Sequence, residues 1–300
     1  MNLVLDFMQA VNTHAFMSRA MTASVIIGLM AGALGTFVIL RGLSLMGDAI
    51  SHAVIPGVAL SHLLGVSTLV GASAFGILAS FLIGFVTEKS TLKKDTIIGV
   101  VFSTFFALGL ILISQIRTAT DLFNVLFGNV LTVSDGDIAN IRWVALGLLV
   151  FLVTMYKKLQ LSSFDPTLAK VYGLNTRVID YLFLVVLTLV IVVSLQVVGA
   201  VLIVSMIIAP AAIAYLLTNR LWIMLLLSAM IGAGVSVVGL FMSFTFNWPP
   251  GASIVLTLGI LFTLTLFLSP QKGLLASRLY RKQVNRTHGV PRNMVVSSIK

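Results

Sequence analysis

Hydrophobic residues form long runs along this chain, and short polar segments separate the runs from residue 20 to residue 269. A helix needs about 20 mostly apolar residues to cross the hydrocarbon core of a bilayer. Runs of this length predict an all-α, polytopic membrane protein with about nine transmembrane helices, within a range of eight to ten. The nine predicted spans are Ala20–Leu40, Asp48–Gly65, Ser67–Thr87, Thr96–Ile116, Ile138–Tyr156, Ile179–Gln196, Val198–Leu217, Trp222–Ser243 and Gly251–Ser269.

The same pattern divides the chain into three regions. Residues 1–16 are too short and too mixed to cross, so we expect them to lie along the membrane interface. Residues 17–269 form the predicted transmembrane domain, and residues 270–300 form a basic tail. The apolar run at 179–217 is about twice one span. It must therefore fold back, and Gln196 and Gly199 mark the expected turn.

Composition supports a membrane protein and excludes a water-soluble one. Apolar residues make up 59% of the chain, charged residues make up 9%, and the mean hydropathy is +1.11. Soluble domains carry roughly 25% charged residues, because polar groups must cover their surface. We therefore expect a multi-pass protein of the cell membrane, surrounded by lipid.

The distribution of positive charge predicts the orientation. The net charge is +10, but the basic residues lie in short loops and in the tail, which indicates orientation in a membrane and not nucleic-acid binding. With the N-terminus outside and the C-terminus in the cytoplasm, sixteen of the nineteen basic residues face the cytoplasm. That set is Arg41, Lys89, Lys93, Lys94, Lys157, Lys158, Lys170, Arg177, Arg220, Lys272, Arg278, Arg281, Lys282, Arg286, Arg292 and Lys300.

The sequence contains no motif for nucleotide hydrolysis. A G-x-x-x-x-G-K-[ST] phosphate loop, a G-x-S-x-G elbow and an H-E-x-x-H zinc motif are all absent. The chain has no cysteine, which excludes disulfides, thiolate metal sites and iron–sulfur clusters. We therefore expect a transport subunit, not an enzyme, with no permanently bound cofactor. Its energy must come from an ion gradient or from a separate subunit.

Ionisable side chains inside a membrane are costly and mark candidate functional positions. We single out Asp48, His52 and His62, all in the second predicted span. Asp48 and His52 are four residues apart and share one face of a helix. A carboxylate and an imidazole without sulfur suit manganese, iron(II) or zinc. Pro56 has no N–H to give to the His52 carbonyl, so this stretch offers two ligand side chains and one freed carbonyl.

Ordinary structural roles also explain these residues. Asp48 can cap its helix at the cytoplasmic interface, and His52 can be a buried histidine satisfied by a neighbouring helix. His62 lies near the outer end of its span, where an interfacial position suits it better than a second contact with a transport path. Pro210 predicts a kink in the seventh span that frees the Met206 carbonyl, but proline is common in membrane helices.

A short helix is predicted outside the membrane, in the cytoplasmic loop between the fifth and sixth spans. Asp165 is a favourable N-cap, Pro166 suits the first helical position and Gly173 suits the C-terminal stop. Such a helix must pack on something, either its own transmembrane domain or a cytoplasmic partner. Between its ends it carries Leu168, Ala169, Val171 and Tyr172.

These stretches resemble the membrane permease of the manganese, zinc and iron family of metal-importing ABC transporters. The resemblance runs in order from residue 17 to about residue 269, and its most specific part is Met-Gly-Asp-x-x-Ser-His-Ala at residues 46–53. It is carried by residues 40–60, by Phe127-Gly128-Asn129, by Phe164-Asp165-Pro166 with Ala169 and Gly173, and by residues 198–211.

The resemblance implies an importer built from two permease copies, two cytoplasmic ATPase subunits and an extracellular metal-binding protein. It implies that the helix at 165–173 is the coupling helix that seats in the ATPase. It also implies that Asp48 and His52 face the metal path. The leading hypothesis is therefore a homodimeric permease subunit of an ATP-driven importer that moves a divalent transition metal into the cytoplasm.

Two other classes of protein stay open from the residues alone. A gradient-driven secondary transporter of a metal or another small solute favours broken helices and several titratable residues, and three in one span make a poor proton relay. A membrane scaffold would give Asp48 and His52 no purpose. Among metals, equal numbers of carboxylate and imidazole ligands favour Mn²⁺ over Zn²⁺ or Fe²⁺.

Overall fold

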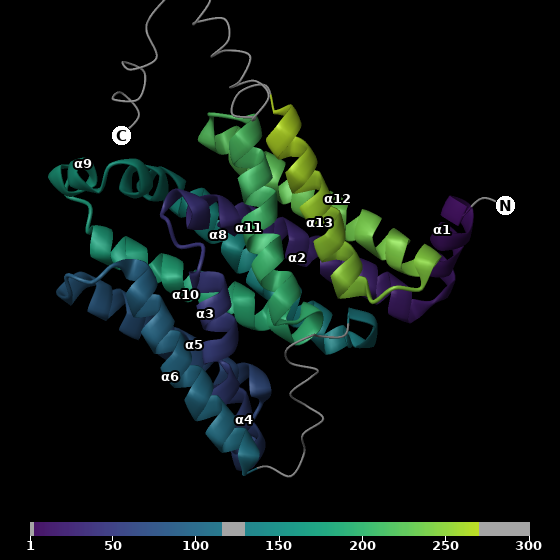
Figure 1. The fold of residues 1–300 in the computed structure, drawn as a ribbon, viewed down its shortest axis with the longest axis horizontal. Coiled ribbons are helices and arrows are strands. Elements are labelled where there is room, and N and C mark those ends of the chain that lie inside the picture. Colours follow the sequence, from purple (N-terminus) through teal and green to yellow (C-terminus); the bar gives the residue numbers. More distant parts are fainter. Residues whose placement is uncertain (1–2, 116–129, 270–300) are drawn as a thin grey trace, which may run out of the picture.

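The computed structural model describes residues 3–115 and 130–269, and every regular element in these ranges is a helix (Figure 1). The all-α fold predicted from the apolar runs is confirmed. The basic tail at 270–300 and the Phe127-Gly128-Asn129 stretch lie outside the described residues. The elements are α1 (Leu3–Thr13), α2 (Ala15–Leu40), α3 (Met46–Ala53), α4 (Ile55–Leu64), α5 (Thr68–Lys89), α6 (Lys94–Ser114), the 3₁₀ turn η1 (Val130–Thr132), α8 (Asp135–Phe164), α9 (Pro166–Val171), α10 (Thr176–Val198), α11 (Ala200–Leu217), α12 (Leu221–Phe246) and α13 (Pro250–Leu268).

Eight of the helices in the described ranges are long and apolar enough to cross a membrane. They correspond to eight of the nine predicted spans. The largest difference is in α8, which continues past the predicted end at Tyr156 as far as Phe164. Lys157 and Lys158 end the apolar run, but lysine is a good helix former, so the helix itself does not stop there.

The second predicted span is two helices instead of one. α3 ends at Ala53, α4 begins at Ile55, and Val54 joins them. Pro56 lies in the first turn of α4, where its missing N–H is tolerated. In one continuous helix it would leave the His52 carbonyl without a donor and its ring would clash with that carbonyl. Proline therefore explains why the chain breaks at this point.

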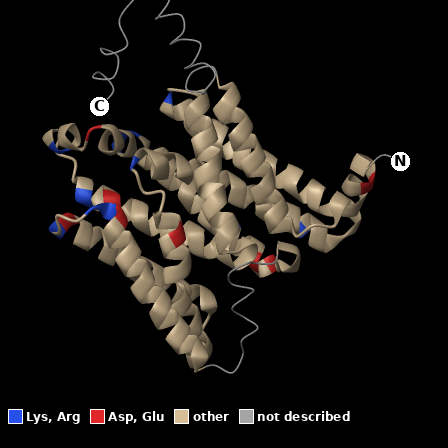
Figure 2. Cartoon of the chain, viewed as in Figure 1, with Lys and Arg blue, Asp and Glu red and all other residues tan. Residues whose placement is uncertain are grey.

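The pair α3–α4 still carries the chain across the helical bundle. Arg41 after α2, Glu88 near the end of α5 and Lys94 at the start of α6 all line one cavity. Figure 2 shows basic residues at the helix ends around this region. The C-terminal ends of α2 and α5 therefore lie on the same side of the bundle, beside this cavity. The pair α3–α4 must lead to the opposite side, because α5 begins there and returns. Together with the eight long helices, the broken pair accounts for the nine predicted crossings.

Small residues let the helices approach closely. α2 packs against α11 and α12, and α3 to α6 form a second group of neighbours (Figure 1). A Cβ on Gly28 would lie 2.5 Å from the Gly232 carbonyl oxygen, and a Cβ on Gly35 would lie 1.8 Å from the Ile207 carbonyl oxygen. In membrane proteins such close approach supplies the van der Waals contact that holds helices together.

Replacing Gly232 with Ala should therefore destabilise the protein. The added Cβ would lie 2.2 Å from the Gly28 carbonyl oxygen, so backbone must shift, at a cost of about 1–3 kcal/mol. Gly234→Ala, in the same helix, is the matched control, because a Cβ there meets nothing within 4 Å. Thermal unfolding in detergent measures the difference, and equal midpoints for the two variants would contradict the close packing of α2 on α12.

The sequence made two further predictions about the backbone, a turn at Gly199 and a kink at Pro210. Gly199 does separate α10 from α11, and its φ of 80° with ψ of 166° is a region that only glycine occupies readily. The predicted turn there is confirmed. Pro210 lies inside α11, which runs from Ala200 to Leu217, and the kink expected there stays a prediction.

The N-terminal segment forms α1, and its one buried side chain packs on the transmembrane domain. Phe7 is buried, and its ring meets the edges of Phe241 and Phe244 of α12, with centroids 5.4 and 5.6 Å away. Leu5 and Met8 are more than half exposed. A position along the membrane interface stays a prediction for this segment.

Candidate functional site

Asp48 and His52 lie on one face of α3, as their spacing predicts. The Asp48 Oδ1 and His52 Nε2 atoms are 3.5 Å apart. The Asp48 side chain is 53% exposed and the His52 side chain is 22% exposed. The carboxylate thus projects from an open face of the single chain, with the imidazole nitrogen directed toward it.

Two aromatic rings of α6 hold the imidazole. The rings of Phe102 and Phe106 both meet the His52 ring edge-on, each with a centroid distance of 5.4 Å. The Nδ1 atom of His52 is buried and has no hydrogen-bond partner among the described residues. Metal-binding histidines usually donate their second ring N–H to a carboxylate or carbonyl. Here the packing of Phe102 and Phe106 orients the ring.

The described part of the chain brings no third ligand to this pair. It contains no group of three or more His, Cys, Asp or Glu side chains placed to hold a metal ion. His62 is exposed on α4, beyond the break at Val54, and forms no cluster with Asp48 and His52. The break also means that His52 and His62 do not share one continuous helix face. Within residues 3–115 and 130–269, one copy therefore offers two neighbouring side-chain ligand candidates at this place, Asp48 and His52.

Asp48 is in the first turn of α3, but its side chain is not the helix cap. Leu45 occupies the N-cap position and makes no side-chain capping hydrogen bond. The alternative that Asp48 is the N-cap of its helix is therefore wrong. A carboxylate at the N-terminal turn still gains from the helix dipole.

The short helix predicted outside the membrane is present as α9, and both of its ends are capped. The Asp165 carboxylate accepts hydrogen bonds from the Thr167 and Leu168 N–H groups at 3.0 and 2.9 Å. Gly173 takes a φ of 76°, and the Leu174 N–H donates to the Ala169 carbonyl at 3.1 Å, which closes the C-terminus. The caps follow the sequence prediction at each position.

α9 packs on its own domain by one side and presents apolar groups on the other. Ala169 is completely buried. Val171 and Tyr172 are 79% and 72% exposed, and Leu168 is 42% exposed. Pro166 and Lys170 line the cavity beneath the helix. One side of α9 therefore packs on its own domain, which is the first of the two surroundings considered from the sequence, and contact of the exposed side with a cytoplasmic partner stays a prediction.

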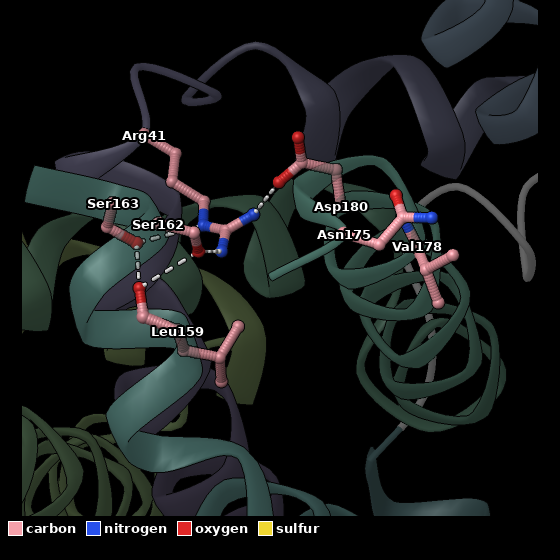
Figure 3. A network of polar contacts seen from close by, with 7 residues as sticks. All are labelled: Arg41, Leu159, Ser162, Ser163, Asn175, Val178 and Asp180. Carbon is pink, nitrogen blue, oxygen red and sulfur yellow. Dashed lines mark hydrogen bonds and ion pairs between the residues drawn. The ribbon is translucent and has the colours of Figure 1, made fainter. Parts of the chain in front are cut away.

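A buried arginine joins the elements around α9 (Figure 3). Arg41, the residue after α2, donates from Nε to Ser163 Oγ at 3.0 Å and from Nη2 to Ser162 Oγ at 2.7 Å. Its Nη1 contacts Asp180 Oδ1 of α10 at 2.5 Å. Its Cζ lies 4.8 Å from the centre of the Phe183 ring. Burial lowers the pKa of the Arg41 guanidinium, while the charge and hydrogen bond of Asp180 raise it.

A match to the family model described as the ABC 3 transport family covers residues 13–269. The chain belongs to this family. The match includes all the transmembrane helices, the Asp48–His52 pair and α9. The resemblance to ABC metal permeases seen in the sequence is confirmed, and this permease is a multi-pass protein of the plasma membrane. Family membership makes it a transport subunit and removes the support for a scaffold or for a carrier acting alone.

Curated relatives cover nearly the whole permease. It is 47% identical over 272 residues to the manganese transport system membrane protein MntC of Listeria innocua. This alignment covers 91% of the present chain and 97% of the relative. It is 35% identical over 296 residues to the chelated iron transport system membrane protein YfeD of Yersinia pestis. That alignment covers 98% of the present chain and 100% of the relative.

A solved structure has the same fold. One chain of PsaBC from Streptococcus pneumoniae, solved in complex with a Fab, matches with a TM-score of 0.83 and 44% identity. The match covers 92% of the permease and 99% of that chain. The likeness therefore covers most of the fold described above.

Sequence reasoning missed the polar cluster around Arg41. Asp180 falls inside the predicted span Ile179–Gln196, but it was not singled out with the ionisable residues of the second span. The available signal was a pair of opposite charges, Arg41 and Asp180, at span ends predicted on the same side of the membrane. Nothing in the sequence indicates that Ser162 and Ser163 complete the cluster.

Proposed function

We propose that this permease moves a divalent transition metal into the cytoplasm along a path that includes Asp48 and His52, and that Mn²⁺ is favoured over Zn²⁺ or Fe²⁺. The observation that carries the proposal is the 3.5 Å approach of Asp48 Oδ1 to His52 Nε2 on an open face of α3. Oxygen and nitrogen ligands without sulfur suit manganese. The relative named for manganese transport, at 47% identity, supports the preference for Mn²⁺. The relative named for chelated iron transport keeps Fe²⁺ among the candidates.

The site needs a second copy of the permease to be complete. One copy supplies two ligand side chains, whereas a twofold assembly supplies two carboxylates and two imidazoles around its axis, and water fills the remaining positions. Two carboxylates also offset the charge of the ion in a medium that cannot solvate it. Exposure of the Asp48 side chain in the single chain fits this arrangement. His62 is a candidate for a contact outside this central site.

The energy source is a pair of cytoplasmic ATPase subunits bound to the outer face of α9, the proposed coupling helix. Support comes from the absence of a phosphate loop in the sequence and from the exposed Val171 and Tyr172 side chains. An extracellular metal-binding protein delivers the ion on the opposite side. The N-terminus lies outside and the C-terminus inside, which is the orientation that the basic residues favour.

Orientation has its own test. An epitope tag placed after Lys300 should resist protease added to intact cells and become sensitive after permeabilisation, since the positive charges keep this end in the cytoplasm. A tag before Met1 is the control and should be cleaved without permeabilisation. The reverse pattern would contradict the topology.

The function is tested in vesicles that contain the permease, its ATPase subunit and its metal-binding protein. Uptake of Mn²⁺ should require ATP and should persist when the proton and sodium gradients are collapsed. Competition with Zn²⁺ and Fe²⁺ measures the order of preference. Uptake that continues without ATP and stops with the gradients would contradict the proposal and favour a gradient-driven carrier.

A further inference from the structure

We propose that Arg41 is a positioning residue that transmits movement of α9 to the helix that carries Asp48 and His52. This inference rests on the proposed function of α9 and of the metal path. It concerns the connection between the two sites, which are separate in the fold and share no residue.

Arg41 is bound to both helices that flank α9. Ser162 and Ser163 lie in the last turn of α8, and the Asp165 N–H donates to the Leu161 carbonyl at 2.9 Å, so α9 follows α8 with no flexible linker. Asp180 lies near the start of α10, the helix that follows α9 in the chain. A tilt of α9 must move one or both of these helix ends, and the guanidinium is attached to each.

The contacts move as a unit because breaking them is costly. The Arg41 side chain is only 8% exposed. Removing its Asp180 partner would leave a buried charge without compensation. A guanidinium has five N–H donors in a rigid fork, which is how one side chain binds two hydroxyls and a carboxylate at once. The cluster is therefore expected to keep its contacts while the helices around it shift.

A short and rigid connection leads from Arg41 to Asp48. The Gly42 N–H donates to the Ile39 carbonyl at 3.1 Å and the Leu43 N–H donates to the Val38 carbonyl at 2.9 Å, which is the closed turn that commonly ends helices. The Met46 N–H then donates to the Leu43 carbonyl at 2.9 Å and begins α3. Asp48 is in the first turn of that helix. Displacement of Arg41 consequently displaces the Asp48 end of α3.

A cavity leaves room for this movement. It has a volume of about 600 Å³ and lies between the Arg41 cluster and the neighbouring ends of α5 and α6. Its lining includes Pro166 of α9, Met46 of α3, and Gly84 and Glu88 of α5. Close-packed interiors transmit strain and resist displacement. An open space beside the cluster allows α9, Arg41 and α3 to move together relative to α5.

The test is the ratio of metal transported to ATP hydrolysed in the assembled importer. Arg41→Ala should lower this ratio about tenfold or more, while basal ATP hydrolysis changes less than about twofold. Arg41→Lys should give an intermediate ratio, because an ammonium keeps a positive charge for Asp180 but lacks the rigid fork that holds both serines. Arg19→Ala is the matched control. It removes an arginine from the other end of α2, with its ion pair to Asp135 at 3.5 Å, and should leave the ratio unchanged.

A milder variant keeps the inference falsifiable if Arg41→Ala does not assemble. Ser162→Ala combined with Ser163→Ala keeps the Arg41–Asp180 ion pair and removes only the attachment to α8, so it should lower the ratio about threefold. An unchanged ratio in that double variant, or in an assembled Arg41→Ala permease, would overturn the inference. The ratio divides the metal transported by the ATP hydrolysed, so a change in it reports on coupling. This result is separate from the question of whether Asp48 contacts the metal.

A distance measurement provides a readout that a purely stabilising role would not move. The chain has no cysteine, so a single spin label can be placed at Leu45→Cys, an exposed position at the start of α3. The distance between labels in two copies should change on ATP addition in the parent protein and in Arg19→Ala. It should not change in Arg41→Ala. A full ATP-dependent change in Arg41→Ala would overturn the inference.

Discussion

Alanine at Asp48 or at His52 should reduce metal uptake by about a hundredfold or more, with the complex still assembled. Loss of a partner outside the ligand shell already costs about 10–100-fold in metal affinity, and each of these changes removes a proposed ligand from both copies. Asp48→Asn separates charge from shape, and should also fail because an amide cannot offset the charge of the ion in the membrane. Uptake of Mn²⁺ in vesicles, with ATP hydrolysis measured in parallel, checks the result.

Matched controls for this prediction lie at the N-terminal end of the chain. Asp6→Ala and His14→Ala remove the same two side-chain types from α1 and from the residue before α2, and both should transport normally. His62→Ala in the same assay decides whether α4 contributes a contact to the path. Uptake of both Mn²⁺ and Zn²⁺ at parent levels in Asp48→Ala and His52→Ala would leave His52 as a packed side chain between Phe102 and Phe106.

Val171→Asp should abolish the stimulation of ATP hydrolysis by the permease while the protein still inserts in the membrane. The Val171 side chain is 79% exposed on α9, so the change costs little in the isolated chain. In the proposed interface with the ATPase it would bury an unpaired charge, which costs several kcal/mol and so about tenfold or more in activity. ATP hydrolysis by the reconstituted complex, compared with the ATPase subunit alone, measures the effect.

Val4→Asp is the matched control for Val171→Asp. It makes the same substitution at a side chain that is 59% exposed on α1 and far from α9 in the sequence, and it should leave stimulation unchanged. Leu168→Asp is a second test on α9 and should act in the same direction. Normal stimulation in both α9 variants would remove this helix from the contact with the ATPase.

Local signals in the sequence determined most of the helices and the ends of α9. A run of about 20 apolar residues has few stable conformations other than a helix in a bilayer, because every backbone polar group must be satisfied within the segment. The caps at Asp165 and Gly173 are equally local, since an N-cap carboxylate and a left-handed glycine each act within about one turn. The face shared by Asp48 and His52 follows from helical periodicity alone.

The tertiary structure decided what lies between the helices. Hydropathy gave the second crossing as one helix, because α3 and α4 are both apolar and only Pro56 marks the break. The placement of Phe102 and Phe106 around His52 depends on how α6 packs on α3, which no window along the chain contains. The Arg41 cluster joins positions more than 120 residues apart. Only the folded chain brings these groups within hydrogen-bonding distance, because burial of a charge must be offset by partners that local sequence does not specify.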